Sequence, residues 1–210
     1  MSALHPNNFF ALEHYDHAEL FKDCEYVWQA LPKIETYLQS HDFHIDIEIP
    51  NGVHLKNKHQ ITIGKGTVLE PGAYIVGPCI IGKNCEIRKN AYIRGKFICG
   101  DGCVVGCEVK GAIFLNEAKA AHYNYIGDSI LGNKVNLGAG TKTANLRFDK
   151  RPVRVRCGDG YVDTELKKFG AIFGDLSQSG CNSVTNPGTL LAKGATILSC
   201  ASANGFIDAQ

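Results

Sequence analysis

The sequence lacks several features that would assign the protein to a common class. It has no excess of charge, with 22 Lys and Arg residues against 21 Asp and Glu residues. General attraction to nucleic acid or to an anionic membrane is therefore not expected. No apolar run approaches the length of a membrane span, and the first residues lack the basic start and apolar core of a signal peptide. We therefore expect a cytoplasmic protein.

Paired cysteines are also missing. The nine cysteines are scattered without CxxC spacing, and nine is an odd number. This pattern argues against both a disulfide framework and a zinc ribbon. We expect reduced thiols and no bound metal.

The strongest pattern that is present is a repeat of six residues. Steps of six from Ile63 reach only apolar residues and one cysteine: Leu69, Ile75, Ile81, Ile87, Ile93, Cys99 and Val105. Small residues recur four places after these positions, and they include Cys79, Cys85 and Cys103. A period of six fits neither a helix nor an ordinary strand, but it suits a chain that turns a corner every six residues. The sequence thus predicts an all-β solenoid in which three hexads make one triangular coil, with these cysteines in its core.

The repeat also sets the expected domain limits. Its phase is lost over residues 111–125 and 146–169 and returns after each, so both segments are predicted to leave the coil as insertions. The solenoid is expected to cover residues 60–205, with a short tail at 206–210.

Residues 1–59 precede the repeat and have a different character. Helical spacing runs to a break at Pro32, and residues 43–50 alternate like a strand. An open coil end exposes strand edges and apolar core, so repeat proteins need terminal elements that cover them. The sequence predicts a small, mainly helical N-terminal cap with this role, or alternatively a surface for subunit or partner contact.

One histidine stands out. After His59 the chain has a single histidine, His122, at the point where the first repeat is interrupted. It begins the stretch His-Tyr-Asn-Tyr-Ile-Gly-Asp, which ends at Asp128. By itself such a residue is more often a surface histidine in a loop.

The hexads and the segment around His122 resemble the left-handed β-helix acyltransferases with hexapeptide repeats. Within them they most resemble the acetyltransferase domain of the bifunctional N-acetylglucosamine-1-phosphate uridyltransferase/glucosamine-1-phosphate acetyltransferase family. The resemblance covers about residues 60–205 and is specific between 108 and 145. It implies a left-handed coil and a homotrimer with sites between neighbouring prisms.

The resemblance also implies roles for particular residues. His122 matches the family's general base. The positions that match its sugar-phosphate ligands are Arg94, Lys110, Tyr125 and Asn136, of which Arg94 fits only if two residues are deleted. On the acyl-donor side the matching positions are Asn145, Cys181 and Ser199, and the basic cluster with Lys150 and Arg151 could meet the phosphates of coenzyme A. The residue type departs from the family at Leu146, Cys181 and Ser199, where the family commonly has tyrosine, serine and alanine.

These residues suit acetyl transfer from acetyl-CoA to the amine of an amino-sugar phosphate. A base must take the amine proton during attack on the thioester, and histidine, with an ordinary pKa near about 6.5, can do so at neutral pH. No metal is required for this reaction. Uridyl transfer is not expected, because residues 1–60 contain neither a Gly-rich phosphate loop nor the length of a nucleotide-binding domain.

Two other functions are compatible with the pattern. A carbonic anhydrase on the same fold needs three zinc-binding histidines, and only His122 lies in the regular coils, so we regard this function as remote. A non-catalytic scaffold that binds sugar phosphates or sugar nucleotides is the stronger alternative, because Leu146 replaces the donor-side tyrosine.

Overall fold

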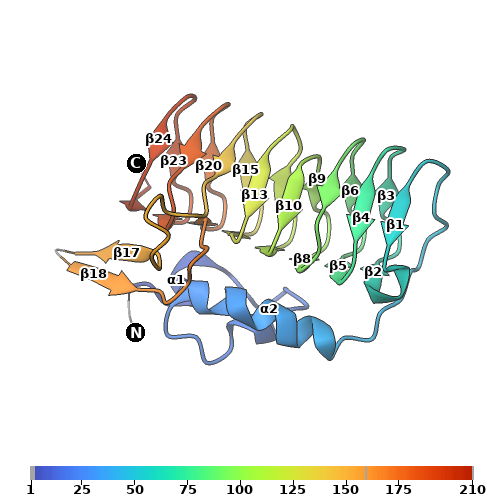
Figure 1. The fold of residues 1–210 in the computed structure, drawn as a ribbon, viewed down its shortest axis with the longest axis horizontal. Helices are drawn as coiled ribbons and strands as arrows, with labels where there is room; N and C mark the ends of the chain where they lie inside the picture. Colours follow the sequence, from blue (N-terminus) through green and yellow to red (C-terminus); the bar gives the residue numbers. More distant parts are fainter. Residues whose placement is uncertain (1–2, 159, 210) are drawn as a thin grey trace.

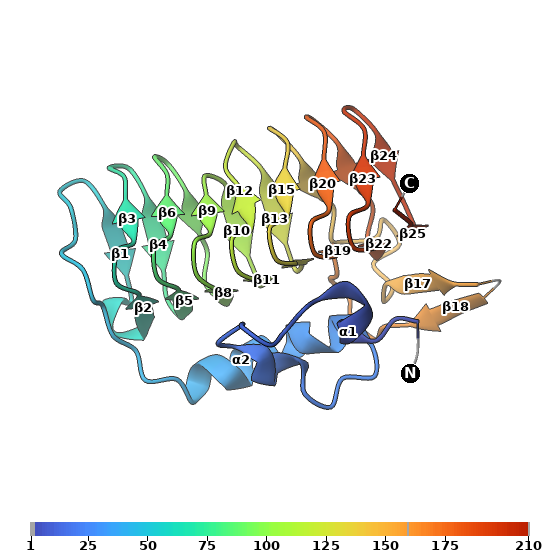
Figure 2. The ribbon, with the colours of Figure 1, turned by 180° about the vertical axis from the view of Figure 1, so that it is seen from behind.

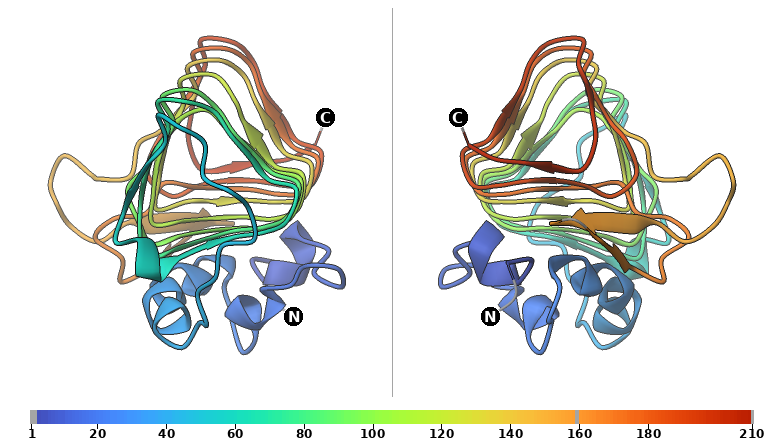
Figure 3. Two further views of the ribbon diagram at one scale, coloured as in Figure 1. Left: turned by 90° about the vertical axis from the view of Figure 1, so that its right-hand side faces the viewer. Right: turned by 90° about the vertical axis from the view of Figure 1, so that its left-hand side faces the viewer.

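Each hexad of the chain forms one short strand and one corner, and three hexads close a triangular coil. The structure, a computed structural model, describes residues 3–158 and 160–209. The strands stack into three parallel sheets that form the sides of a prism (Figure 1, Figure 3). The predicted solenoid of hexapeptide repeats is therefore confirmed.

Sheet A is the base of the prism and contains eight strands. They are β2 (Ile61–Ile63), β5 (Cys79–Ile81), β8 (Phe97–Cys99), β11 (Ala112–Phe114), β14 (Ile130–Leu131), β19 (Ala171–Phe173), β22 (Thr189–Leu191) and β25 (Phe206–Ile207).

Sheet B also contains eight strands, and each of them precedes a strand of sheet A in the chain. They are β1 (His54–Lys56), β4 (Tyr74–Val76), β7 (Tyr92–Ile93), β10 (Glu108–Lys110), β13 (Tyr125–Gly127), β16 (Lys142–Thr143), β21 (Val184–Thr185) and β24 (Ser202–Ala203).

Sheet C contains seven strands and closes the third side. They are β3 (Val68–Leu69), β6 (Glu86–Ile87), β9 (Val104–Val105), β12 (Lys119–Ala120), β15 (Asn136–Leu137), β20 (Gln178–Ser179) and β23 (Thr196–Ile197).

The coil is left-handed, as the family resemblance implies. The left panel of Figure 3 looks along the prism from its N-terminal coils. The chain passes from sheet B at the left, through sheet A at the base, to sheet C at the right, while it recedes from the viewer. A chain that turns counterclockwise as it moves away from the viewer forms a left-handed helix.

The interior contains the residues that the hexads predict. The side chains of Ile63, Ile81 and Ile93 are fully buried and belong to one core that runs the length of the prism. The core includes all of the small-slot cysteines. Corners adopt left-handed backbone, for example at Asn84 (φ 53°) and Asn90 (φ 63°), a conformation that Asn tolerates better than most residues.

Residues 111–125 do not leave the coil, which corrects the expected insertion. They contain β11 and β12, which pair in parallel with β8 and β9. Ile80 pairs with Ile98, eighteen residues later, but Ile98 pairs with Ile113, only fifteen residues later. The hexad phase is lost because two corners are shorter, not because a loop is added.

Residues 146–169 do leave the coil, between β16 and β19. They contain a two-stranded antiparallel hairpin, β17 (Arg154–Cys157) and β18 (Gly160–Asp163), which projects from the corner between sheets B and A (Figure 1). On one of its faces, Val153 and Val155 are buried.

The coil extends beyond both expected limits. It begins with β1 at His54 rather than near residue 60, and Phe206 and Ile207 form β25, which pairs with β22. The first two residues of the supposed tail therefore form a strand, and residue 210 lies outside the described residues.

The helical part of the N-terminal segment covers a side of the prism, not its end. It contains α1 (Pro6–Phe9), two 3₁₀ helices (Ala18–Phe21 and Val27–Gln29) and α2 (Ala30–Gln39), which lie beneath sheet A (Figure 1, Figure 2). A third 3₁₀ helix (Lys58–Gln60) leads into β2. The expected helical cap over the coil end is thus wrong as to place, whereas residues 43–50 do cover that end.

Two details of the N-terminal segment also differ from expectation. Pro32 does not break a helix, because it lies in the first turn of α2, where its missing N–H is not needed. Residues 43–50 form no continuous strand, and only Ile45 makes a bridge, to Ile63. Instead Ile45, Ile47 and Ile49 pack against the open end of the core. In the described residues no helix is both long and apolar enough to cross a membrane.

Candidate functional site

His122 lies at the corner where the chain turns from β12 of sheet C to β13 of sheet B. Its main chain is held on both sides. The N–H donates to Oδ1 of Asn124 (3.1 Å), and the carbonyl accepts from the N–H of Gly140 on the next coil (2.9 Å). The side chain is exposed, and among the described residues the imidazole has no hydrogen bond or ion pair. The corner is fixed while the ring is left free to meet a ligand.

Asn124 is the residue that sequence reasoning missed. It is 3% exposed and occupies a slot that holds Ala91 and Cys107 on earlier coils. Its Nδ2 donates to the Gly138 carbonyl (2.7 Å) while its Oδ1 supports His122. A polar residue in an apolar hexad slot was the available signal.

A column of corner residues continues from His122 along the prism. The registers Lys119↔Asn136, Asn136↔Gln178 and Gln178↔Thr196 define the stacking of these coils. Three residues after each of these positions come, in order, His122, Ala139, Cys181 and Ser199. Strands stack about 4.8 Å apart, so Cys181 and Ser199 lie about 10 and 14 Å along the column from His122. We call this column the C–B edge.

Three of the predicted substrate residues meet on the outer face of sheet B. The register Ile93↔Val109 places Arg94 beside Lys110, and Glu108↔Tyr125 places Tyr125 on the next coil. Arg94 is already engaged, because its guanidinium donates to Glu108 at 2.7 Å and lies 5.8 Å from the centre of the Tyr92 ring. Exposed ion pairs of this kind contribute little to stability, so an incoming anion can compete for Arg94.

Asn136 does not join this group within one chain. It is exposed on the outer face of sheet C, where it pairs with Lys119 and Gln178. The C–B edge separates it from the residues on sheet B. A convex edge cannot enclose a ligand that touches both faces.

The remaining donor-side candidates lie at the opposite border of sheet B. Asn145 follows β16 at the corner between sheets B and A, and its Nδ2 donates to Asp128 at 2.5 Å. Lys150 and Arg151 are exposed at the start of the hairpin insertion, after a turn in which Arg147 binds Asp149. Within one chain these three residues are therefore separated from Cys181 and Ser199 by the width of sheet B.

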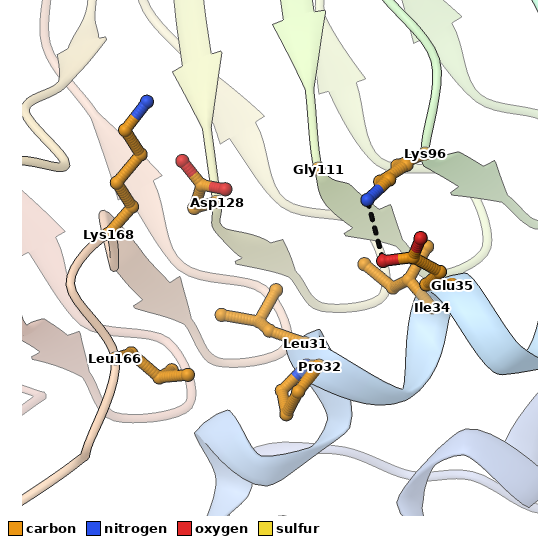
Figure 4. Close-up of a pocket in the computed structure, with 9 residues that line it drawn as sticks. All are labelled: Leu31, Pro32, Ile34, Glu35, Lys96, Gly111, Asp128, Leu166 and Lys168. Atoms are coloured by element: carbon orange, nitrogen blue, oxygen red, sulfur yellow. Dashed lines mark hydrogen bonds and ion pairs between the residues drawn. The ribbon is translucent and has the colours of Figure 1, made fainter.

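A cavity of about 180 Å³ opens at that corner, between α2 and the hairpin insertion (Figure 4). Apolar side chains of α2, including Leu31 and Ile34, form one side of it. Lys96 donates to Glu35 at 2.7 Å within it, and Asp128 forms part of the other side. The sequence could not reveal this cavity, because it exists only where the N-terminal segment meets the prism.

Cys79, Cys85 and Cys103 are buried in the core, as the six-residue repeat predicts, and all nine cysteines are free thiols, six of them buried. Burial raises the pKa of the Cys79 thiol to about 12. A thiol of this kind is protonated and inert at neutral pH. The exposed thiols are Cys157, Cys181 and Cys200.

Comparison with known proteins bears on this fold. Residues 60–95 match the model of the bacterial transferase hexapeptide family (six repeats). The chain is 34% identical over 163 residues to a putative uncharacterized acetyltransferase, YaiX, of Escherichia coli K12, covering 76% of this chain and 71% of that protein. The chain belongs to the hexapeptide-repeat transferase family.

Other members of the hexapeptide family match a shorter region. The bifunctional protein GlmU of Methanococcus aeolicus is 41% identical over 90 residues, which are 43% of this chain and 22% of GlmU. The chain thus matches about a fifth of the length of such bifunctional relatives. A crystal structure of a histidine-to-alanine mutant of GDP-perosamine N-acetyl transferase from Caulobacter crescentus, in complex with CoA and GDP-perosamine, gives a TM-score of 0.31 at 12% identity. That match covers 84% of this chain and 60% of that protein.

Proposed function

We propose that this hexapeptide transferase moves an acetyl group from acetyl-CoA to the amine of an amino-sugar phosphate, with glucosamine 1-phosphate the first acceptor to test. The observation that supports the proposal best is the C–B edge. It carries His122 in line with Cys181 and Ser199, and it borders the face of sheet B that holds Lys110. Relatives named as acetyltransferases add support at the level of the family.

His122 acts as the general base in this proposal. The neutral amine attacks the thioester carbonyl, and the imidazole accepts a proton from the nitrogen as the C–N bond forms. The tetrahedral intermediate then collapses, the C–S bond breaks, and the imidazolium returns its proton to the sulfur, so that coenzyme A leaves as the thiol. Asn124 is a positioning residue, because it fixes the backbone of the corner and not the ring itself.

The N–H of Ala139 is the donor best placed to stabilise the oxyanion. The neighbouring N–H groups of the Gly138–Gly140 turn are the other candidates. Gly138 N–H, however, donates to Ser179 and Gly140 N–H to His122. Among the described residues the Ala139 N–H donates to no protein group, and it lies one coil from His122 on the C–B edge. A backbone donor so placed would lower the barrier when charge develops on the carbonyl oxygen.

The acceptor phosphate is assigned to Lys110 and Arg94. Both are cationic, adjacent and at least partly exposed on the face of sheet B. Tyr125 lies on the next coil, toward His122, where it would contact the sugar between the bound phosphate and the base. Charge-assisted bonds to a phosphate would orient the sugar so that its amine faces the base.

A homotrimer completes the site in this proposal. Asn136 and the sheet B residues lie on opposite sides of a convex edge, so a ligand can touch both only if a neighbouring prism supplies one of them. The same arrangement would let Asn145, Lys150 and Arg151 of one chain meet coenzyme A bound along the edge of another. Sedimentation that shows only monomer at micromolar concentration would overturn both the assembly and the shared site.

The decisive test compares two histidine variants in an assay of coenzyme A release. His122→Ala should lower kcat/KM by about 10²- to 10⁴-fold, the range typical of a positioned base, with an unchanged melting temperature. His54→Ala is the matched control, because His54 is also exposed, on β1 at the far end of sheet B, and it should retain full activity. A folded His122→Ala variant that transfers acetyl groups at the wild-type rate would refute the assignment.

The non-catalytic scaffold remains a second candidate function because of Leu146. This residue is 45% exposed, bridges Lys168, and stands where the resemblance implies a donor-side tyrosine. A scaffold would raise its melting temperature with sugar phosphates but not with acetyl-CoA, whereas the transferase should respond to both.

A further inference from the structure

Three sulfur atoms converge inside the prism, where sheet A passes into sheet C and not at the C–B edge. The Sγ atoms of Cys85, Cys99 and Cys103 lie within 4.8 Å of one another, and the three residues are 2%, 0% and 0% exposed. Cys85 and Cys103 directly precede the paired strands β6 and β9, so they stack on successive coils. Cys99 joins them from the end of β8 in sheet A.

Packing explains two of these cysteines better than the third. Cys85 and Cys103 fill slots that hold small residues on the neighbouring coils, namely Thr67 and Ala118. Cys99, however, stands at a position where large residues face the core: its paired neighbours in sheet A are Ile81 and Phe114. A small polarizable thiol there brings a third sulfur to the pair.

Charge decides which ion such a site can hold. No Lys or Arg among the described residues is buried, so no cation in the core could balance a charged complex. Three thiolates around a monovalent ion carry two net negative charges, and around a divalent ion they carry one. Around a trivalent ion they carry none. Burying an unbalanced charge is costly, so the apolar interior favours the neutral complex.

We propose that Cys85, Cys99 and Cys103 form a binding site for a trivalent thiol-seeking ion, of which arsenite is the probe. In the binding reaction three As–S bonds form and three As–O bonds of arsenous acid break. Each thiol proton leaves with a hydroxide as water, so one As(OH)₃ and three thiols give one tris-thiolate and three waters. No oxidant or reductant is needed, and no fourth ligand is required from the core.

The closed core sets the conditions for loading. The Cys85 thiol donates to the Gly100 carbonyl (3.2 Å) and the Cys103 thiol to the Leu115 carbonyl (3.0 Å). Binding gives up both hydrogen bonds, and the coil must open to admit the ion. We therefore expect slow uptake by the native protein and rapid uptake when the chain refolds with arsenite present.

The test uses the full chain, refolded without oxygen in the presence of arsenite and analysed by intact mass under native conditions. A tris-thiolate adds one arsenic and removes three hydrogens. A two-thiol adduct at the surface instead retains a hydroxyl group, so the masses distinguish the two sites. X-ray absorption at the arsenic edge should then show three sulfur neighbours and no oxygen. The melting temperature should rise, because the folded arrangement presents three thiols together and so binds the ion more tightly than the unfolded chain does.

Matched variants locate the site. Replacing the exposed thiols together, as Cys157→Ser, Cys181→Ser and Cys200→Ser, should leave the adduct in place, whereas Cys99→Val should abolish it. Cys79→Ala controls for the loss of a buried core thiol outside the cluster and should retain binding. If Cys99→Val does not fold, Cys103→Ala serves the same purpose. The proposal is overturned if the wild-type chain refolds in the presence of arsenite and carries no arsenic. It is also overturned if the adduct is lost when the three exposed cysteines are replaced.

Discussion

Sheet A and sheet B are built from the same repeat but face different surroundings. Nearly every strand of sheet A is buried throughout, and most of them are entirely apolar, as in Phe97–Cys99 and Ala171–Phe173. Strands of sheet B bury only alternate residues, as in Glu108–Lys110. In sheet A the outward residues, among them Ile98 and Ile113, pack against Trp28 and the rest of the N-terminal segment.

The difference teaches how one coil can serve both stability and function. A parallel sheet covered on both faces reads as a continuous apolar run, whereas an open face can carry polar side chains. Because the N-terminal segment occupies the base, sheets B and C and the edge between them stay free. The candidate residues His122, Lys110 and Asn136 all lie on this free surface.

The largest difference in stability between the two sheet faces is expected when a charged residue is placed on each kind of outer face. Ile98→Asp buries a carboxylate between sheet A and the N-terminal segment and should lower the unfolding free energy by about 4 kcal/mol or more. Val68→Asp, on the outer face of sheet C, is the control, because Val68 is 57% exposed; it should change stability by less than about 0.5 kcal/mol. Chemical unfolding followed by fluorescence measures both, and equal effects would show that sheet A is not sealed.

The next largest effect is expected from acid, which should destabilise the packing of the N-terminal segment against sheet A. His17, 9% exposed, has a pKa lowered to about 4 by burial, partly opposed by Asp16 and assisted by His41. The unfolded chain therefore binds a proton more readily than the native one between pH 6.5 and 4. Stability falls as the pH falls through this window, by up to about 3 kcal/mol at its lower end.

The pH effect can be measured with Trp28, the single tryptophan, which lies in the N-terminal segment. Urea unfolding at pH 7 and pH 4.5 should show a smaller difference for His17→Gln than for wild type. His54→Gln, which alters an exposed histidine, should leave the difference unchanged. An unaltered pH dependence in His17→Gln would contradict the account.

On the free surface, removing a single cationic side chain should weaken binding of the acceptor and leave folding unchanged. Lys110→Ala should raise KM for the phosphorylated acceptor about tenfold, equivalent to about 1.4 kcal/mol, with little change in melting temperature. Lys134→Ala is the control, because Lys134 is an exposed lysine paired with Glu117 away from sheet B. If an acceptor without a phosphate reacts equally well, Lys110 and Arg94 lose their assigned role.

The smallest expected effect concerns the ion pair on sheet B. Glu108→Gln frees Arg94 from its 2.7 Å partner and should lower KM for the phosphorylated acceptor a few-fold. Glu86→Gln removes the corresponding partner of Arg88, at 2.8 Å, and should leave KM unchanged. A higher KM in Glu108→Gln would indicate that Glu108 itself holds the acceptor.

The sequence predicted a structural feature correctly where the interactions that determine the feature are local in the chain. The hexads predicted the solenoid and its core, because the size of each inward slot is set within one coil. The same pattern misled at residues 111–125, where a shortened coil and an inserted loop both disturb the phase and cannot be told apart without the pairing of β11 with β8. The candidate residues followed from spacing to His122, but Asn124 was overlooked because its partners lie on adjacent residues and coils.

By itself, the sequence determined the six-residue period, the inward residues and the corner at His122, since these depend on contacts between a hexad and its immediate neighbours. The tertiary structure alone decided that the N-terminal segment seals sheet A, that His122 is aligned with Cys181 and Ser199, and that Asn136 lies across an edge from Lys110. It also brought Cys99 to Cys85 and Cys103. These relations join residues from different sheets or from coils that are distant in the sequence, and they exist only after the coil has closed and stacked.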